Sequence, residues 1–258
     1  MTPSLVAAFA AVLGLAVGSF LNVVAYRLPR GESVVSPPSA CPACGTPIRA
    51  RHNVPVLGWL VLRGRCHDCA SPISVRYPLV EAATGVLFGL AGWRFAAEPA
   101  LLAAYLCFAA VAVALALIDL DVRRLPNVIV LPSYPVLALL LALAADRPSL
   151  VRAGVGALVL VAFFLAVSLT APGAMGLGDV KLAGVVGGMS AYLSWGAFLV
   201  GAFGGFVLGS LAGVLLMASR RAGRRSAVPF GPFMLLGAWA SILGASGLGE
   251  LYLERLRL

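Results

Sequence analysis

The chain has 258 residues, of which 61% are hydrophobic and only 11% are charged. Soluble domains carry about a quarter of charged residues, so this composition excludes a soluble globular protein and indicates an integral membrane protein. The formal net charge of +9 would suggest nucleic acid as a partner of a soluble chain. Here the arginines cluster in the short connections between apolar segments, which is the positive-inside pattern of membrane proteins. We therefore expect the lipid bilayer, and not a nucleic acid, as a partner of this chain.

Eight apolar segments follow one another along the chain. Most approach the length of about 20 residues that spans a bilayer as a helix, and they lack the alternating pattern of an outer-membrane barrel. The sequence therefore predicts an all-α polytopic protein with about eight transmembrane helices. The first segment has no basic residue before it, so we interpret it as a retained span rather than a signal peptide. The segments are residues 5–25, 79–97, 100–118, 127–145, 151–171, 182–191, 196–218 and 230–250.

The distribution of basic residues predicts the orientation of these spans. With the N-terminus outside, residues 26–78, 119–126, 172–181 and 219–229 are cytoplasmic, and they hold 14 of the 19 Lys and Arg residues. This bias favours the orientation. We expect three parts: a first transmembrane helix (1–25), a cytoplasmic cysteine-rich domain (26–78) and a larger transmembrane domain (79–258). No internal repeat is apparent.

The cytoplasmic insert contains two C-x-x-C pairs, separated by 21 residues. This spacing is typical of a zinc ribbon, in which two turns present four thiolates to one tetrahedral ion. Gly45 suits the backbone turn that follows the first pair. Disulfides are the alternative, and a cytoplasmic location disfavours them. Because all four ligand positions are protein thiolates, we expect a structural zinc bound by Cys41, Cys44, Cys66 and Cys69.

Two aspartates, Asp119 and Asp179, lie at the ends of apolar segments in a chain with only 10 acidic residues. An ionisable side chain at membrane depth is costly and is a functional candidate by default. The predicted orientation places both on the cytoplasmic side. If they share a water molecule, one is protonated and the other ionised, because adjacent like charges resist joint ionisation. Such a pair can catalyse aspartic proteolysis.

Four neighbouring residues are candidates for supporting roles. Asp121 follows Asp119 by two positions, so the two side chains point to nearly opposite faces of a helix. Asp121 either supports the site or pairs with a nearby arginine at the headgroups. Gly176 and Gly178 give the backbone freedom ahead of the second aspartate. Lys181 either pairs with that aspartate or anchors its helix at the membrane interface.

At these positions the sequence resembles the prepilin peptidases, the type IV leader peptidases of bacteria. The similarity runs over nearly the whole chain. Each motif alone is weak, but their order and spacing together are specific. Besides both cysteine pairs, the motifs are residues 18–24, 26–29, 76–81, 119–121, 125–127, 175–182 and 229–232.

The resemblance implies an aspartic protease of the Gly-x-Gly-Asp type in the bacterial inner membrane. Its catalytic aspartates would be Asp119 and Asp179, and its substrates would be prepilins and pseudopilins of type IV pili or type II secretion, cleaved on the cytoplasmic side. A homo-oligomer remains open.

Family members with the long cysteine-bearing loop also methylate the new N-terminal residue, with S-adenosylmethionine as donor. Glu81 could receive a basic group or the new amino terminus, or simply act as an acid near a helix N-terminus. The residues that the resemblance suggests for methyl transfer lie in the insert and its junctions and are Asn22, Gly64, Arg65, Arg76, Tyr77 and Glu81.

Two other classes of protein compete with the protease. A transporter or proton-coupled channel also uses paired membrane acids, but it predicts inverted repeats and acids near the bilayer midplane, and neither is apparent. A non-enzymatic scaffold would present the zinc ribbon to a partner, and its aspartates would be structural.

Overall fold

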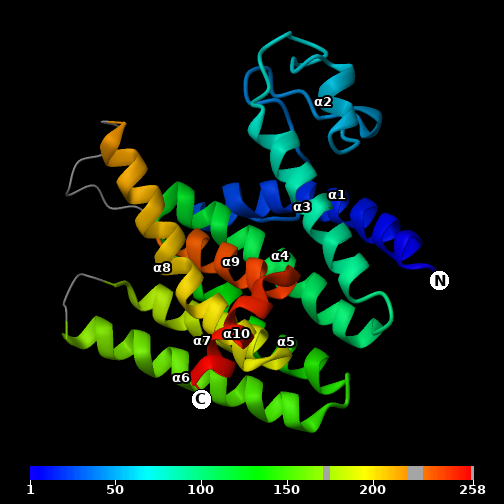
Figure 1. Ribbon diagram of the computed structural model, residues 1–258. Helices are drawn as coiled ribbons and strands as arrows, with labels where there is room; N and C mark the ends of the chain where they lie inside the picture. The colour runs from blue at the N-terminus through cyan, green and yellow to red at the C-terminus, as the bar shows by residue number, and fades with distance from the viewer. Residues whose placement is uncertain (171–174, 220–228, 257–258) are drawn as a thin grey trace. The chain divides into compact units, whose positions relative to one another are not determined.

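The computed structural model describes residues 1–170, 175–219 and 229–256 (Figure 1). Within these ranges the regular structure is helical, with two isolated β-bridges and no strand. The predicted all-α class is therefore confirmed for the described residues. The chain divides into two compact units, Met1–Ala114 and Leu115–Leu258.

Both units consist mainly of helices, and in the first unit the connections 31–49 and 62–75 carry the cysteine pairs. The first unit contains α1 (Pro3–Arg27), η1 (Leu28–Arg30), η2 (Ala50–His52), α2 (Leu57–Val61), α3 (Arg76–Arg94) and the start of α4 (Pro99–Val122). The second unit contains the end of α4 and then α5 (Asn127–Ala142), α6 (Arg147–Thr170), α7 (Leu177–Leu193), α8 (Trp195–Ala218), α9 (Gly231–Ala240), η3 (Ser241–Ala245) and α10 (Ser246–Leu256).

Several of these helices are long and apolar enough to cross a membrane. Within the described residues five meet this criterion, which supports a multi-pass membrane protein. The count of eight spans stays a prediction, since α5 and α7 have only 16 and 17 residues, fewer than the usual 20 or so. The five are Pro3–Arg30, Pro99–Val122, Arg147–Thr170, Trp195–Ala218 and Gly231–Arg255.

In the first unit, α1 packs closely against α3. A Cβ at Gly18 would lie 2.9 Å from the Glu81 Cα and from the Thr84 Cβ, so glycine lets the two backbones approach. Buried Asn22, one turn further along α1, donates hydrogen bonds to the Gly18 and Tyr77 carbonyls, both at 3.3 Å. Since α1 and α3 flank the cysteine-rich insert, this contact fixes the distance between its two ends.

In the second unit, α7 is largely buried and runs beside α6 (Figure 1). The two helices meet at glycines: a Cβ at Gly156 would lie 2.4 Å from the Ala191 Cβ, and one at Gly187 would lie 2.5 Å from the Gly156 carbonyl oxygen. Helix α8 follows α7 after a single residue, Ser194, whose hydroxyl accepts the Ala197 N–H at 3.0 Å. The predicted division of this tract into two helices is confirmed.

Arg152 of α6 caps the C-terminal end of α7. Its guanidinium donates to the carbonyls of Ala191 (2.5 Å), Tyr192 (2.5 Å) and Leu193 (3.0 Å). The last carbonyls of a helix have no partner within the helix, and a charged donor satisfies them strongly. The cap therefore holds α7 in place at the end opposite Asp179.

We expect Arg152→Ala to lower the free energy of unfolding by roughly 2 kcal/mol or more, because three buried carbonyls lose a charged donor. Thermal unfolding of the purified protein in detergent measures this loss. Arg147→Ala, at the exposed first position of the same helix, is the matched control. Equal midpoints for the two variants would contradict the capping role.

Candidate active site and metal centre

Asp119 lies in the last turn of α4 and is 5% exposed. Its Oδ2 accepts the backbone N–H of Gly231, the first residue of α9, at 3.1 Å. A Cβ at Gly231 would lie 2.8 Å from that oxygen, so a larger residue there would displace the carboxylate. Free N–H groups at a helix N-terminus favour a negative charge. The carboxylate of Asp119 is thus held by the start of another helix.

Asp179 is the third residue of α7 and is partly buried. Its own N–H donates to the Gly176 carbonyl at 3.0 Å, which closes the turn ahead of the helix. A Cβ at Gly176 would lie 3.4 Å from the Asp179 Oδ2. The carboxyl groups of Asp179 and Asp119 are close enough to interact electrostatically. The two predicted catalytic acids therefore lie in the same region of the second unit.

Leu125 lies between the segments that carry the two acids. A Cβ at Gly178, next to Asp179, would be 3.2 Å from the Leu125 Cβ. A Cβ at Gly231, the partner of Asp119, would be 3.6 Å from the Leu125 Cδ2. Both glycines leave room for this side chain. We infer that Leu125 sets the spacing between the start of α7 and the start of α9.

Helix α5 holds the first turn of α7 by two polar contacts. The Nζ of Lys181 donates to the Asn127 Oδ1 at 3.0 Å, and the Tyr134 hydroxyl donates to the Lys181 carbonyl at 2.5 Å. A Cβ at Gly184 would lie 2.1 Å from the Tyr134 hydroxyl oxygen. Lys181 thus bonds to α5 in the structure. Sequence analysis missed Tyr134, because nothing in its local pattern indicates a distant partner.

Asp121 lies on the exposed side of the last turn of α4. Its neighbour Asp119 is buried, as expected for two residues on opposite helix faces.

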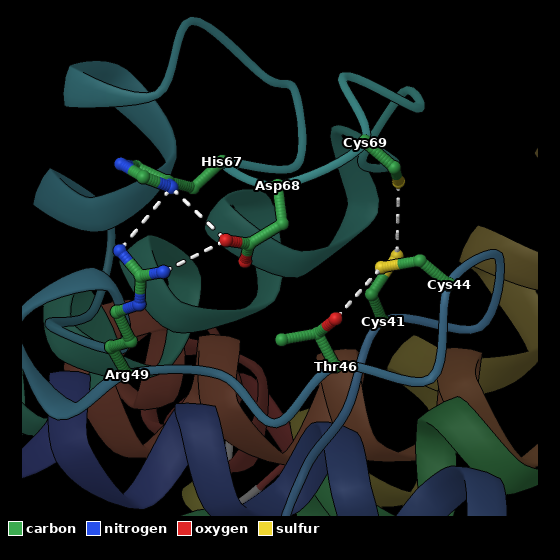
Figure 2. A network of polar contacts seen from close by, with 7 residues as sticks. All are labelled: Cys41, Cys44, Thr46, Arg49, His67, Asp68 and Cys69. Carbon is green, nitrogen blue, oxygen red and sulfur yellow. Dashed lines mark hydrogen bonds and ion pairs between the residues drawn. The ribbon is translucent and has the colours of Figure 1, made fainter.

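The four cysteines of the insert form one cluster. Their Sγ atoms all lie within 4.8 Å of one another, and all are free thiols rather than disulfides. The Sγ atoms of Cys41 and Cys69 are 3.8 Å apart (Figure 2). Four sulfurs at about 2.3 Å from a tetrahedral ion lie about 3.8 Å from one another. The cluster can therefore hold a metal ion.

Two hairpins of the same geometry carry the cysteine pairs. Residues 40–47 and 65–72 each close with one antiparallel bridge. In each, the amide of the first cysteine donates to the carbonyl five positions later, at 3.0 and 2.8 Å. The residue after the second cysteine has a positive φ, 72° at Gly45 and 58° at Ala70. The turn predicted at Gly45 is confirmed, but sequence analysis missed this short internal repeat.

Ser71 supports the thiolate form of two ligands. Its hydroxyl lies 3.5 Å from the Cys41 Sγ and 3.1 Å from the Cys69 Sγ. The Ser71 hydroxyl, helped by backbone hydrogen bonds, lowers the pKa of Cys41 to about 6. The same hydroxyl lowers the pKa of Cys69. Since the thiolate is the metal-binding form, these lowered pKa values favour cation binding at Cys41 and Cys69.

A polar network beside the cluster joins the two halves of the insert (Figure 2). Arg49 follows the first hairpin, and its guanidinium lies 2.8 Å from the Asp68 carboxylate and 3.3 Å from the His67 Nδ1. The His67 ring stacks on His52, with ring centroids 4.7 Å apart. These contacts are exposed, so they orient the hairpins more than they stabilise the fold.

The candidate methyltransferase residues lie in the first unit. Buried Glu81 accepts the Val56 N–H at 2.7 Å, and Val56 has a positive φ of 61° just before α2. Gly64 also has a positive φ, 68°, and a Cβ there would lie 2.8 Å from the Trp59 ring. Glu81 therefore fixes the start of α2, and Gly64 permits the turn that follows it.

The other four candidates occupy the junctions and the second hairpin. Asn22 is bonded to the Tyr77 carbonyl, and Arg65 forms the bridge of the second hairpin with Pro72. Arg76 and Tyr77 are exposed at the start of α3.

Two family models match the chain. Residues 12–95 match the bacterial peptidase A24 N-terminal domain, and residues 106–248 match the type IV leader peptidase family. The matches define a peptidase with membrane-spanning helices. The chain belongs to the type IV leader peptidase family. The transporter and scaffold alternatives are set aside because the matched family is one of peptidases.

The sequences of several similar proteins align with most of this chain. A prepilin leader peptidase/N-methyltransferase of Myxococcus xanthus is 41% identical over 231 residues, covering 86% of this chain and 67% of that protein. One from Pseudomonas putida is 36% identical over 286 residues and covers 100% and 96%. One from Neisseria gonorrhoeae is 36% identical over 261 residues and covers 89% and 87%. No solved structure matches the chain.

We expect Gly231→Ala to reduce leader-peptide cleavage by roughly a hundredfold, because the added methyl displaces the Asp119 carboxylate from the start of α9. The cleavage rate of the purified variant, with its thermal midpoint, measures the effect. Gly154→Ala is the control, since a Cβ there meets nothing within 4 Å. A Gly231→Ala enzyme as active as this control would show that the contact does not matter.

Proposed function

We propose that the chain is an aspartic endopeptidase that removes the leader peptide from type IV prepilins and pseudopilins. The observation that carries this proposal is the proximity of two carboxyl groups, Asp119 and Asp179, in a member of the type IV leader peptidase family. The relatives named above are prepilin leader peptidases. We place the reaction at the cytoplasmic face of the bacterial inner membrane, because the positive-inside pattern predicts that both acids lie on that side.

The surroundings of the two acids suggest a different protonation state and a different catalytic role for each. Asp119 keeps its negative charge, because it accepts an N–H at the start of α9. It removes a proton from a water molecule as the water oxygen attacks the scissile carbonyl carbon. Asp179 is the protonated partner and donates a hydrogen bond to the carbonyl oxygen. As the intermediate collapses, the carbon–nitrogen bond breaks and the proton held by Asp119 passes to the leaving amine.

The substrate and the site agree in charge and polarity. A prepilin leader is basic and its mature segment is an apolar helix, so the leader stays in the cytoplasm while the helix lies in the bilayer. The bond between them then lies at the level of the membrane surface. Both acids occupy helix ends, Asp119 at the end of α4 and Asp179 at the start of α7.

A second activity, N-methylation of the new N-terminal residue, is proposed from the names of the relatives. S-adenosylmethionine would supply the methyl group. Exposed Tyr77 offers a ring for the donor's adenine, and Arg65 and Arg76 offer guanidinium groups for its carboxylate. Glu81 and Gly64 would shape this region by fixing α2 and the turn after it.

The cysteine cluster is proposed to hold a structural zinc ion. Four thiolates complete a tetrahedral site and leave no position for a substrate. With Zn²⁺ bound, the ion would link the two hairpins and stabilise the insert.

Asp119→Asn and Asp179→Asn are each expected to lower the cleavage rate by about a thousandfold or more, because neither amide can exchange the required proton. The assay incubates purified protein with a prepilin peptide and follows the product masses. Asp146→Asn, an exposed aspartate before α6, is the control and keeps full activity. Normal cleavage by either active-site variant, with the protein folded, would refute the proposal.

The same assay with labelled S-adenosylmethionine examines methylation. The expected product of the unmodified enzyme carries one methyl group on its new amino terminus. A product that is cleaved but unlabelled would remove the second activity and leave the first intact.

We expect about one zinc ion per chain by elemental analysis, as the four-thiolate site requires. Cys41→Ser and Cys69→Ser should each lose this metal, whereas Cys107→Ser, outside the cluster, should retain it. Retention of zinc by all three variants would place the metal elsewhere.

A further inference from the structure

An aromatic groove begins one residue away from the contact that holds Asp119. The groove has a volume of about 200 Å³ and is lined by Phe206, Gly209, Ser210, Phe230 and Phe233. Phe230 directly precedes Gly231, whose N–H is bonded to the Asp119 carboxylate. One lining residue of the groove is therefore the chain neighbour of the residue that binds Asp119.

The aromatic rings that line the groove pack against a buried phenylalanine. The ring of Phe164, which is fully buried, lies 5.5 Å from the Phe206 ring and 6.1 Å from the Phe230 ring, measured between centroids. The Phe206 and Phe230 rings are 5.0 Å apart. Packed aromatic rings of this kind hold one another in place. The groove is thus preformed and does not need a ligand to assemble it.

The floor of the groove is open because residue 209 is a glycine. A Cβ at Gly209 would lie 3.6 Å from the rings of Phe230 and Phe233, which is ordinary van der Waals contact. Packing therefore does not require glycine here. The missing side chain leaves space for an external group, and this distinguishes Gly209 from the glycines that allow helices to touch.

The lining indicates what kind of group fits. Among the residues that the structure describes, the lining contains no charged side chain, and its polar side chain is the hydroxyl of Ser210. It is formed by α8 and by the start of α9, and both helices belong to candidate membrane spans. A basic leader would gain nothing here, because burying a charge without a partner is costly. An apolar side chain would gain burial against aromatic rings.

We infer that this groove is a substrate subsite that binds one large apolar side chain of the mature segment, close to the scissile bond. The inference rests on the proposed peptidase function and adds a determinant of specificity to it. The apolar half of the substrate enters the membrane beside α8 and α9, and one of its side chains fills the space above Gly209. This contact positions the scissile carbonyl beside Asp119.

The test is to fill the groove with a side chain of the protein itself. Gly209→Leu places a side chain in the groove, and Gly213→Leu, one turn further along α8 where a Cβ meets nothing within 4 Å, is the control. Both are assayed for kcat/KM with prepilin peptides that carry either Phe or Ala at each of the first positions after the scissile bond. Gly209→Ala, which makes only ordinary contacts, provides a milder step should the larger change impair folding.

Gly209→Leu is expected to lower kcat/KM by roughly tenfold or more for the peptide that carries Phe at one particular position after the scissile bond. The peptide with Ala at that same position should be affected little. Gly209→Ala should give a smaller shift of the same sign, and Gly213→Leu none. Equal losses for Phe and Ala peptides at all positions would overturn the subsite. So would an unchanged preference combined with a new dependence on acyl-chain length in vesicles, which would identify a lipid-binding groove. Failure of the unmodified enzyme to cleave any peptide would instead refute the peptidase function itself.

Discussion

The hydrogen bond from the Gly231 N–H to the Asp119 carboxylate organises the second unit of this protein. It joins residues 112 positions apart in the chain, and it places a helix N-terminus against a buried acid. A buried carboxylate without such a partner would be strongly unfavourable. The bond also fixes where α9 begins, and hence where Leu125 and the aromatic groove lie. The position of Asp119 relative to α9 therefore depends on this one requirement for charge compensation.

Helix α7 supplies the second acid from a firmly held position. Asn127 and Tyr134 of α5 hold its first turn, and Arg152 of α6 holds its last carbonyls. Between these ends the helix is buried against close-packed glycines. Rigid support of this kind suits a catalytic group whose geometry must be kept within a fraction of an ångström.

Much of this arrangement could be predicted from the sequence, and the reasons differ between elements. Apolar runs such as 100–118 and 196–218 predict helices because burial in lipid and helix formation leave the same pattern. The four cysteines were found because metal ligands repeat at fixed local spacing. Asp119 and Asp179 are candidates because acids are rare at membrane depth. The contacts of Tyr134 and Gly231 were not predictable, since each depends on packing between segments far apart in the chain. The hairpin repeat was missed because Gly45 and Ala70 adopt the same turn with different side chains.

The division of the cysteine cluster between two hairpins has a consequence for biosynthesis. Each hairpin offers two thiolates, so neither can bind a metal ion through four thiolates until the other has been made. The first transmembrane helix precedes both hairpins in the chain, and the next one follows them. The insert therefore closes only after the ribosome has released residue 72, when the first helix has already left it. Residues 73–258 follow the second hairpin, so the four-thiolate cluster can close before most of the membrane part of the chain has been made.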